Sequence, residues 1–139
     1  MAIRMEGAGD QAQPEPVDLV AYCCENSAGP AMSALRRAGK LDHVKMRVIT
    51  MPCAGNLNLV NIINDFVNGA QGVLVAACRH KNCMHANGDR TALRRVERAR
   101  QILKDLNLDP DRIAFLNTAS NMPDEVDQAV RELYGRVHR

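Results

Sequence analysis

Five cysteines are the residues of this chain whose type and spacing point to chemistry. Cys23 and Cys24 are adjacent, Cys53 follows a proline, and Cys78 and Cys83 are separated by four residues. An odd number of thiols cannot pair off completely into disulfides, and thiols in the cytoplasm are kept reduced. Metal binding, thiol catalysis and burial in the core are therefore the roles to compare.

An iron–sulfur cluster is the metal centre that this cysteine content suits best. Such a cluster binds through soft thiolates, four for each cluster. The four would be one of the Cys23–Cys24 pair together with Cys53, Cys78 and Cys83. Zinc accepts the same thiolates, with His80 or His85 as nitrogen ligands, but structural zinc sites usually contain two close cysteine pairs and this chain has one near-example. Free cysteine is also among the most buried residue types, so core thiols stay an alternative.

Catalysis by a cysteine thiol has less support. Low-molecular-weight phosphatases place a nucleophilic cysteine after the first strand and require an arginine six residues later. The residues six positions after the five cysteines are Gly29, Pro30, Leu59, Met84 and Asp89. None is an arginine, and the chain also lacks a Cys-x-x-Cys redox motif, a Walker loop and a GxGxxG motif after a strand. A thiol oxidoreductase is therefore the third choice of function.

Hydrophobic patterning predicts four strands and four helices that alternate along the chain. The expected strands are residues 17–23, 46–51, 72–77 and 113–117. The expected helices are residues 28–38, a segment from a turn at 54–56 to a stop at Gly69, residues 89–107 and residues 124–137. The second helix has an apolar stripe at helical spacing, made of Leu59, Ile62, Ile63, Phe66 and Val67. This alternation is typical of an α/β domain with a parallel sheet.

The predicted strands bring the cysteines to one edge of that sheet. The first three strands each end at or just before a cysteine. Right-handed crossovers make such strands parallel, so their carboxyl ends lie at the same edge. We therefore expect the Cys23–Cys24 pair, Cys53, Cys78 and Cys83 to converge. Ligands of open parallel sheets bind beyond this edge.

The composition argues against several classes of function. The 139 residues suit one domain, with residues 1–16 as a flexible N-terminal tail and residues 17–139 as the domain. No segment approaches the roughly 20 apolar residues of a membrane span, and the N-terminus does not resemble a signal peptide, so we expect a cytoplasmic protein. A net charge of +2 and 3% aromatic residues give little support to nucleic-acid binding. The basic stretch 90–100 is most often a solvated helix face, with partner docking as the alternative.

Four sequence blocks, in order, resemble a known family. They are YCCENSA, MPCAG, VLVAACRHKNCMHANGD and the pair Arg94–Arg95. Over roughly residues 17–120 this order is similar to the delta subunit of methyl-viologen-reducing hydrogenase, a small iron–sulfur subunit found with heterodisulfide reductase in methanogens and other anaerobes. The resemblance implies a 2Fe-2S cluster. It also implies an electron relay from a hydrogenase or another dehydrogenase to the flavin subunit of a heterodisulfide-reductase-type complex.

The resemblance also selects among the cysteines. Some relatives keep only the cysteine directly before Glu-Asn, which corresponds to Cys24 and not Cys23. The ligand set that the resemblance implies is Cys24, Cys53, Cys78 and Cys83. Two positions depart from the family pattern: Ser27 stands where many relatives have a further cysteine, and Asn82 replaces an acidic residue beside the cluster loop.

We therefore expect a flavodoxin-like three-layer α/β domain with a four-stranded parallel sheet and the cysteines at its C-terminal strand edge. It would carry one 2Fe-2S cluster and serve as an electron-transfer subunit of an oxidoreductase complex rather than as a catalyst on its own. The expected partners are a hydrogenase or other dehydrogenase subunit, together with a flavin-containing heterodisulfide-reductase-like subunit. The alternative is a zinc-bearing or metal-free interaction module that holds such partners together.

Overall fold

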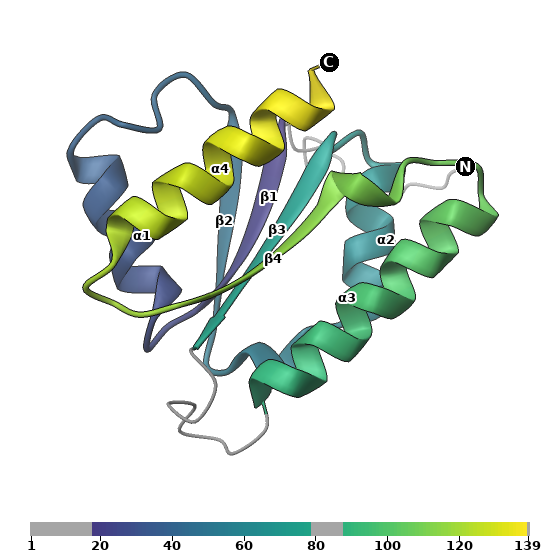
Figure 1. Ribbon diagram of the computed structural model, residues 1–139, viewed down its shortest axis with the longest axis horizontal. Coiled ribbons are helices and arrows are strands. Elements are labelled where there is room, and N and C mark those ends of the chain that lie inside the picture. Colours follow the sequence, from purple (N-terminus) through teal and green to yellow (C-terminus); the bar gives the residue numbers. More distant parts are fainter. Residues whose placement is uncertain (1–17, 79–87, 139) are drawn as a thin grey trace, which may run out of the picture.

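Strands and helices alternate along the described chain, which comprises residues 18–78 and 88–138 of the computed structural model (Figure 1). The strands are β1 (Leu19–Cys24), β2 (Met46–Met51), β3 (Gly72–Cys78) and β4 (Ile113–Thr118). The helices are α1 (Ala28–Arg37), α2 (Leu59–Val67), α3 (Gly88–Asp105) and α4 (Pro123–Val137). Two 3-10 turns, η1 (Ala54–Asn56) and η2 (Pro110–Arg112), precede α2 and β4. The predicted alternation is confirmed.

The ends of the elements differ from the sequence-based prediction by one or two residues. The sequence predicts that the first strand ends at Cys23, whereas β1 continues through Cys24, which pairs with Met51 of β2. Cys24 is therefore held in the sheet and not in a loop. The third helix ends at Asp105, before the predicted end at residue 107, and Asn107 has a left-handed φ of 63° that cannot continue a helix.

The four strands form one parallel sheet with the order β2-β1-β3-β4. The chain leaves β1 for β2 on one side and later returns to β3 on the other side, so the strand order reverses between β1 and β3. In open parallel sheets, ligands bind beyond the carboxyl ends of the strands at such a switch point. The architecture confirms the expected flavodoxin-like fold with a four-stranded parallel sheet.

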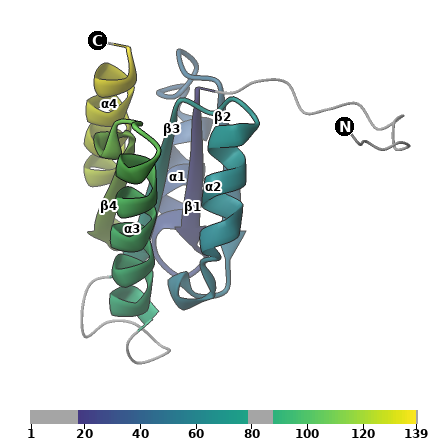
Figure 2. The ribbon, with the colours of Figure 1, turned by 90° about the vertical axis from the view of Figure 1, so that its right-hand side faces the viewer.

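Helices cover both faces of the sheet, with α1 and α4 on one side and α2 and α3 on the other (Figure 1), and they run alongside the strands (Figure 2). Side chains of a strand alternate between the two layers. In β1, Val20 and Tyr22 belong to the core beneath α2 and α3, whereas Ala21 and Cys23 belong to the core beneath α1 and α4. The pleat thus points Tyr22 and Cys23 in opposite directions.

The inner face of α2 differs from the predicted apolar stripe at one position. Ile62 is fully buried, as expected, but Val67 is 76% exposed and Asp65 is only 6% exposed. Asp65 lies three residues after Ile62, at the spacing that keeps both on one side of a helix. The prediction was therefore wrong at Val67, and a carboxyl group lies under the helix instead. Within the described residues, no helix combines the length and the apolar character that crossing a membrane requires.

Candidate functional site

Cys24 and Cys78 meet at the switch point of the sheet. Cys24 is the last residue of β1 and Cys78 is the last residue of β3, the two strands between which the order reverses. Their Sγ atoms are 3.4 Å apart, and both residues are buried. This separation is longer than the roughly 2.05 Å of a disulfide bond, so the two sulfurs are not bonded to each other. Two potential soft ligands therefore lie side by side where this fold class binds ligands.

Cys53 lies in a tight turn after β2. The N–H of Gly55 donates a hydrogen bond to Cys53 Sγ over 3.3 Å, and the N–H of Asn56 donates to the Cys53 carbonyl over 2.9 Å. The turn also packs against the start of α3, because a Cβ added to Gly55 would lie 3.2 Å from the Cα of Gly88 and 3.5 Å from Cys53 Sγ. A side chain here would be tight against the backbone of Gly88, so a glycine suits this close approach, and its N–H is directed at a sulfur.

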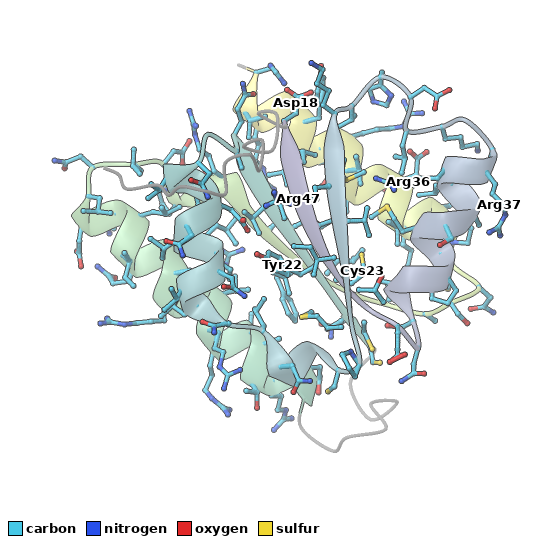
Figure 3. All side chains as sticks on the ribbon, turned by 180° about the vertical axis from the view of Figure 1, so that it is seen from behind. Asp18, Tyr22, Cys23, Arg36, Arg37 and Arg47 are labelled. Atoms are coloured by element: carbon cyan, nitrogen blue, oxygen red, sulfur yellow. The ribbon has the colours of Figure 1, made fainter. Side chains whose placement is uncertain are left out.

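Cys23 has a different environment from Cys24, although the two are neighbours in sequence. Its side chain is fully buried in the core beneath α1 and α4. Burial raises the pKa of the Cys23 thiol from 9.0 to about 12, and the positive charge of Arg36, on the same side of the sheet in Figure 3, opposes this only in part. Cys23 therefore stays protonated at neutral pH. The expected convergence of all five cysteines is wrong for Cys23, because strand alternation turns it into the core.

Two polar residues bind the backbone carbonyls of Cys24 and Cys78. The amide nitrogen of Asn117, in β4, donates a hydrogen bond to the carbonyl of Cys78 over 2.7 Å. Ser27 follows Cys24 by three residues, and its N–H donates to the Cys24 carbonyl over 3.1 Å. The Ser27 hydroxyl is buried and has no hydrogen-bond partner within residues 18–78 and 88–138. A buried hydroxyl without a partner costs stability, which marks this position as unusual.

A buried polar network joins α2 to the sheet near the site. The Tyr22 hydroxyl donates to Asp65 Oδ2, and the guanidinium of Arg47 donates to Asp65 Oδ1 over 2.8 Å. Tyr22 and Arg47 lie on the same side of the strands in Figure 3. Burial raises the pKa of Asp65, while the hydrogen bond from Tyr22 and the charge of Arg47 oppose the rise. Burial and the contact with Asp65 also raise the pKa of Tyr22.

The arginines of the basic stretch divide into two groups in α3. Arg90, Arg94 and Arg98 are exposed, as expected of a solvated helix face. Arg95 is half-buried, and its Nη1 donates to the carbonyls of Gly55 and Leu57 over 2.6 Å each. Arg100 donates to the carbonyl of Ile113. The interpretation as a solvated face is therefore wrong for Arg95 and Arg100, which bind backbone carbonyls of neighbouring segments.

The predicted site residues are only partly placed by the structure. Cys24 and Cys78 are brought together, and Cys53 lies in the turn that contacts the start of α3. Cys83, Asn82 and the histidines His80 and His85 lie outside the described residues. Among the residues that are described, no three cysteine, histidine or carboxylate side chains are arranged to hold one metal ion. The full ligand set stays a prediction.

Sequence reasoning named Ser27 and the Arg94–Arg95 pair through the family resemblance, but it did not predict their contacts, and it did not find Asp65. A signal existed for Asp65, since its spacing from Ile62 places a charge on the inner face of an amphipathic helix. No comparable signal predicts the backbone contacts of Arg95, because exposed and half-buried arginines alternate within one helix and look alike in the sequence.

Comparisons with known proteins give this site a family context. The sequence profile described as methyl-viologen-reducing hydrogenase, delta subunit, matches residues 19–139. The vhu iron–sulfur subunit of the F420-non-reducing hydrogenase from Methanopyrus kandleri is 28% identical over 120 residues, which cover 86% of this chain and 90% of the relative. The corresponding subunit from Methanocaldococcus jannaschii is 27% identical over 126 residues, covering 90% of this chain and 92% of the relative. One subunit of the ferredoxin:CoB-CoM heterodisulfide reductase from Methanosarcina mazei is 31% identical over 99 residues, which are 70% of this chain but 12% of that longer protein.

Proposed function

The chain belongs to the methyl-viologen-reducing hydrogenase delta subunit family, and we propose that it is an electron-transfer subunit carrying one 2Fe-2S cluster. The proposed ligands are the thiolates of Cys24, Cys53, Cys78 and Cys83. When bound, such a cluster accepts and releases single electrons, and the protein contributes its ligands, hydrogen bonds and charge. The chain would relay electrons between a hydrogenase or other dehydrogenase and the flavin subunit of a heterodisulfide-reductase-type complex.

The contact between Cys24 and Cys78 is the observation that carries this proposal. Their sulfurs are 3.4 Å apart at the ends of β1 and β3, close enough for both thiolates to bind one cluster. At this separation the two sulfurs are not joined in a disulfide with each other. Both residues are the last members of paired strands at the switch point, which supports the proposal that they are ligands.

The surrounding residues also suit an iron–sulfur centre. Hydrogen bonds from backbone N–H groups to cysteine sulfur tune such clusters, and Gly55 provides one to Cys53. The buried Ser27 hydroxyl lacks a partner among the described residues, and a bound cluster that extended to this hydroxyl would offer it a sulfur acceptor. Cys23 is less suited to be a ligand because its side chain is fully buried in the core beneath α1 and α4.

The proposed partners follow from the relatives. Those that match along nearly their whole length are named as hydrogenase iron–sulfur subunits, and another match lies within a longer heterodisulfide reductase subunit. A chain of this family that occurs both separately and inside a larger reductase subunit suits a relay between the two activities. The second candidate function is a zinc-bearing or metal-free interaction module, and the relatives' names as iron–sulfur subunits favour the first candidate over it.

Substitution of the thiol pair tests the proposal. Protein purified without air should lose most of its iron and acid-labile sulfide in Cys24→Ala and in Cys78→Ala, because each variant removes one of four ligands. Cys23→Ala is the matched control and should keep both. If Cys24→Ala and Cys78→Ala keep full iron and sulfide while remaining folded, these residues are not ligands. A Cys24–Cys78 disulfide in wild-type protein without iron would favour thiol chemistry instead.

A further inference from the structure

Arg95 joins α3 to another segment of the chain. Its Nη1 donates two hydrogen bonds of 2.6 Å, one to the carbonyl of Gly55 and one to the carbonyl of Leu57. Arg94, the adjacent residue, is exposed and donates to Thr91 of its own helix over 3.3 Å. The two arginines carry the same charge on the same helix, and within residues 18–78 and 88–138 Arg95 bridges to another segment whereas Arg94 does not, which makes Arg94 a matched control.

The segment that Arg95 binds is the turn that contains Cys53. Gly55 takes part in this turn twice: its N–H donates to Cys53 Sγ, and its carbonyl accepts from Arg95. The carbonyl of Leu57 fixes the exit of the same turn, just before α2 begins. Charge-assisted bonds of this kind are roughly twice as strong as neutral ones. The guanidinium therefore holds both the middle and the end of the turn against α3.

We propose that Arg95 is a positioning residue for Cys53, because it fixes the turn in which the Gly55 N–H points at the Cys53 sulfur. This inference rests on the proposed function, in which Cys53 is a cluster ligand. Arg95 acts through the Gly55 and Leu57 carbonyls. In a bound cluster, its positive charge and the N–H···S hydrogen bond would both stabilise the additional negative charge of the reduced form, so both would raise the reduction potential.

The first test uses the metal-free protein and does not depend on a cluster. Iodoacetamide labelling, with the labelled cysteines identified by mass spectrometry, is compared in wild type, Arg95→Gln and Arg94→Gln. Cys53 should react about tenfold faster in Arg95→Gln, which corresponds to about 1.4 kcal/mol in the local opening equilibrium. Arg94→Gln should match wild type. Equal Cys53 rates in the two variants would overturn the inference.

Cys23 reports on global unfolding in the same experiment, because it is fully buried on the opposite face of the sheet. If it too reacts faster in Arg95→Gln, that variant is unfolded and Arg95→Lys replaces it. Lysine keeps the charge but has no planar guanidinium with donors in a fixed geometry. Cys53 should then react faster than in wild type while Cys23 does not, and a wild-type rate for Cys53 would overturn the inference.

The second test measures the reduction potential of the loaded protein by a redox titration followed by electron paramagnetic resonance. The potential of Arg95→Gln should be more negative than that of Arg94→Gln, since both have lost one charge and only the first has lost the anchored turn. Identical potentials would overturn the inference and leave the proposed function standing. Wild-type protein without iron and sulfide would refute the proposed function, and the labelling rates would then decide alone whether Arg95 positions Cys53.

Discussion

Replacing Cys23 with alanine separates the roles of the two adjacent cysteines at the end of β1. Cys23 is fully buried among apolar side chains, whereas Cys24 contacts Cys78. The substitution removes one sulfur atom from a packed core and leaves a small cavity. We expect it to lower the free energy of unfolding by about 1–2 kcal/mol, from the loss of buried apolar contact and the cavity together. The thiol pair of Cys24 and Cys78 should be unaffected.

Cys23→Ser should be more damaging than Cys23→Ala, although serine is closer to cysteine in shape. A serine hydroxyl at this position would be buried in an apolar environment, which costs about 1–3 kcal/mol for a group without a hydrogen-bond partner. Loss of the cluster in Cys23→Ser would therefore not distinguish a ligand from a core residue. Alanine is the informative substitution.

Urea unfolding of the metal-free variants, followed by circular dichroism, measures these stabilities, and iron and sulfide assays measure cluster content. The expected order of stability is wild type, then Cys23→Ala, then Cys23→Ser. Cys23→Ala should bind as much iron as wild type. A folded Cys23→Ala protein that binds no iron would refute the assignment of Cys24 over Cys23 as the ligand.

Three further predictions concern the residues around the site. Tyr22→Phe should lower the free energy of unfolding by about 1.5–3 kcal/mol, because it removes a hydrogen bond to the buried carboxyl group of Asp65. If urea unfolding gives the same free energy for Tyr22→Phe and wild type, this hydrogen bond does not contribute to stability. In metal-free protein, the free energy of unfolding should fall by up to about 4 kcal/mol as the pH rises from 9 to 12. The reason is that the Cys23 thiol loses its proton at a lower pH in the unfolded chain than in the folded core. Urea unfolding at a series of pH values should therefore show a smaller fall in Cys23→Ala. Ser27→Ala should leave the stability of metal-free protein unchanged or raise it, since the hydroxyl has no partner in the described residues, and a clear loss in thermal melts would contradict this.

The fold could be predicted from the sequence because its signals are local and repeated. Apolar strands bounded by glycine or proline alternate with amphipathic helices, and this pattern indicates a parallel sheet with one functional edge. The position of Cys78 at that edge follows directly from the strand 72–77. The strand order β2-β1-β3-β4 did not follow from these signals, because the same alternation fits other orders.

The details of the site depend on a shift of one residue and on long-range contacts. β1 continues one residue further than predicted, which holds Cys24 in the sheet beside Cys78, and strand alternation turns Cys23 into the core. Arg95 contacts residues about 40 positions earlier in the chain, and no local pattern encodes such a contact. The choice of Cys24 over Cys23 comes from the family resemblance, and the position of Cys23 in the core beneath α1 and α4, with Cys24 against Cys78, is consistent with it.

The metal content of the wild-type protein tests the central claim most directly. Iron, zinc and acid-labile sulfide are measured on protein purified without air, together with its visible spectrum. We predict about two irons and two sulfides for each chain, with the charge-transfer absorption of a 2Fe-2S cluster and no stoichiometric zinc. One zinc for each chain with no sulfide would contradict the electron-transfer role and favour the structural interaction module.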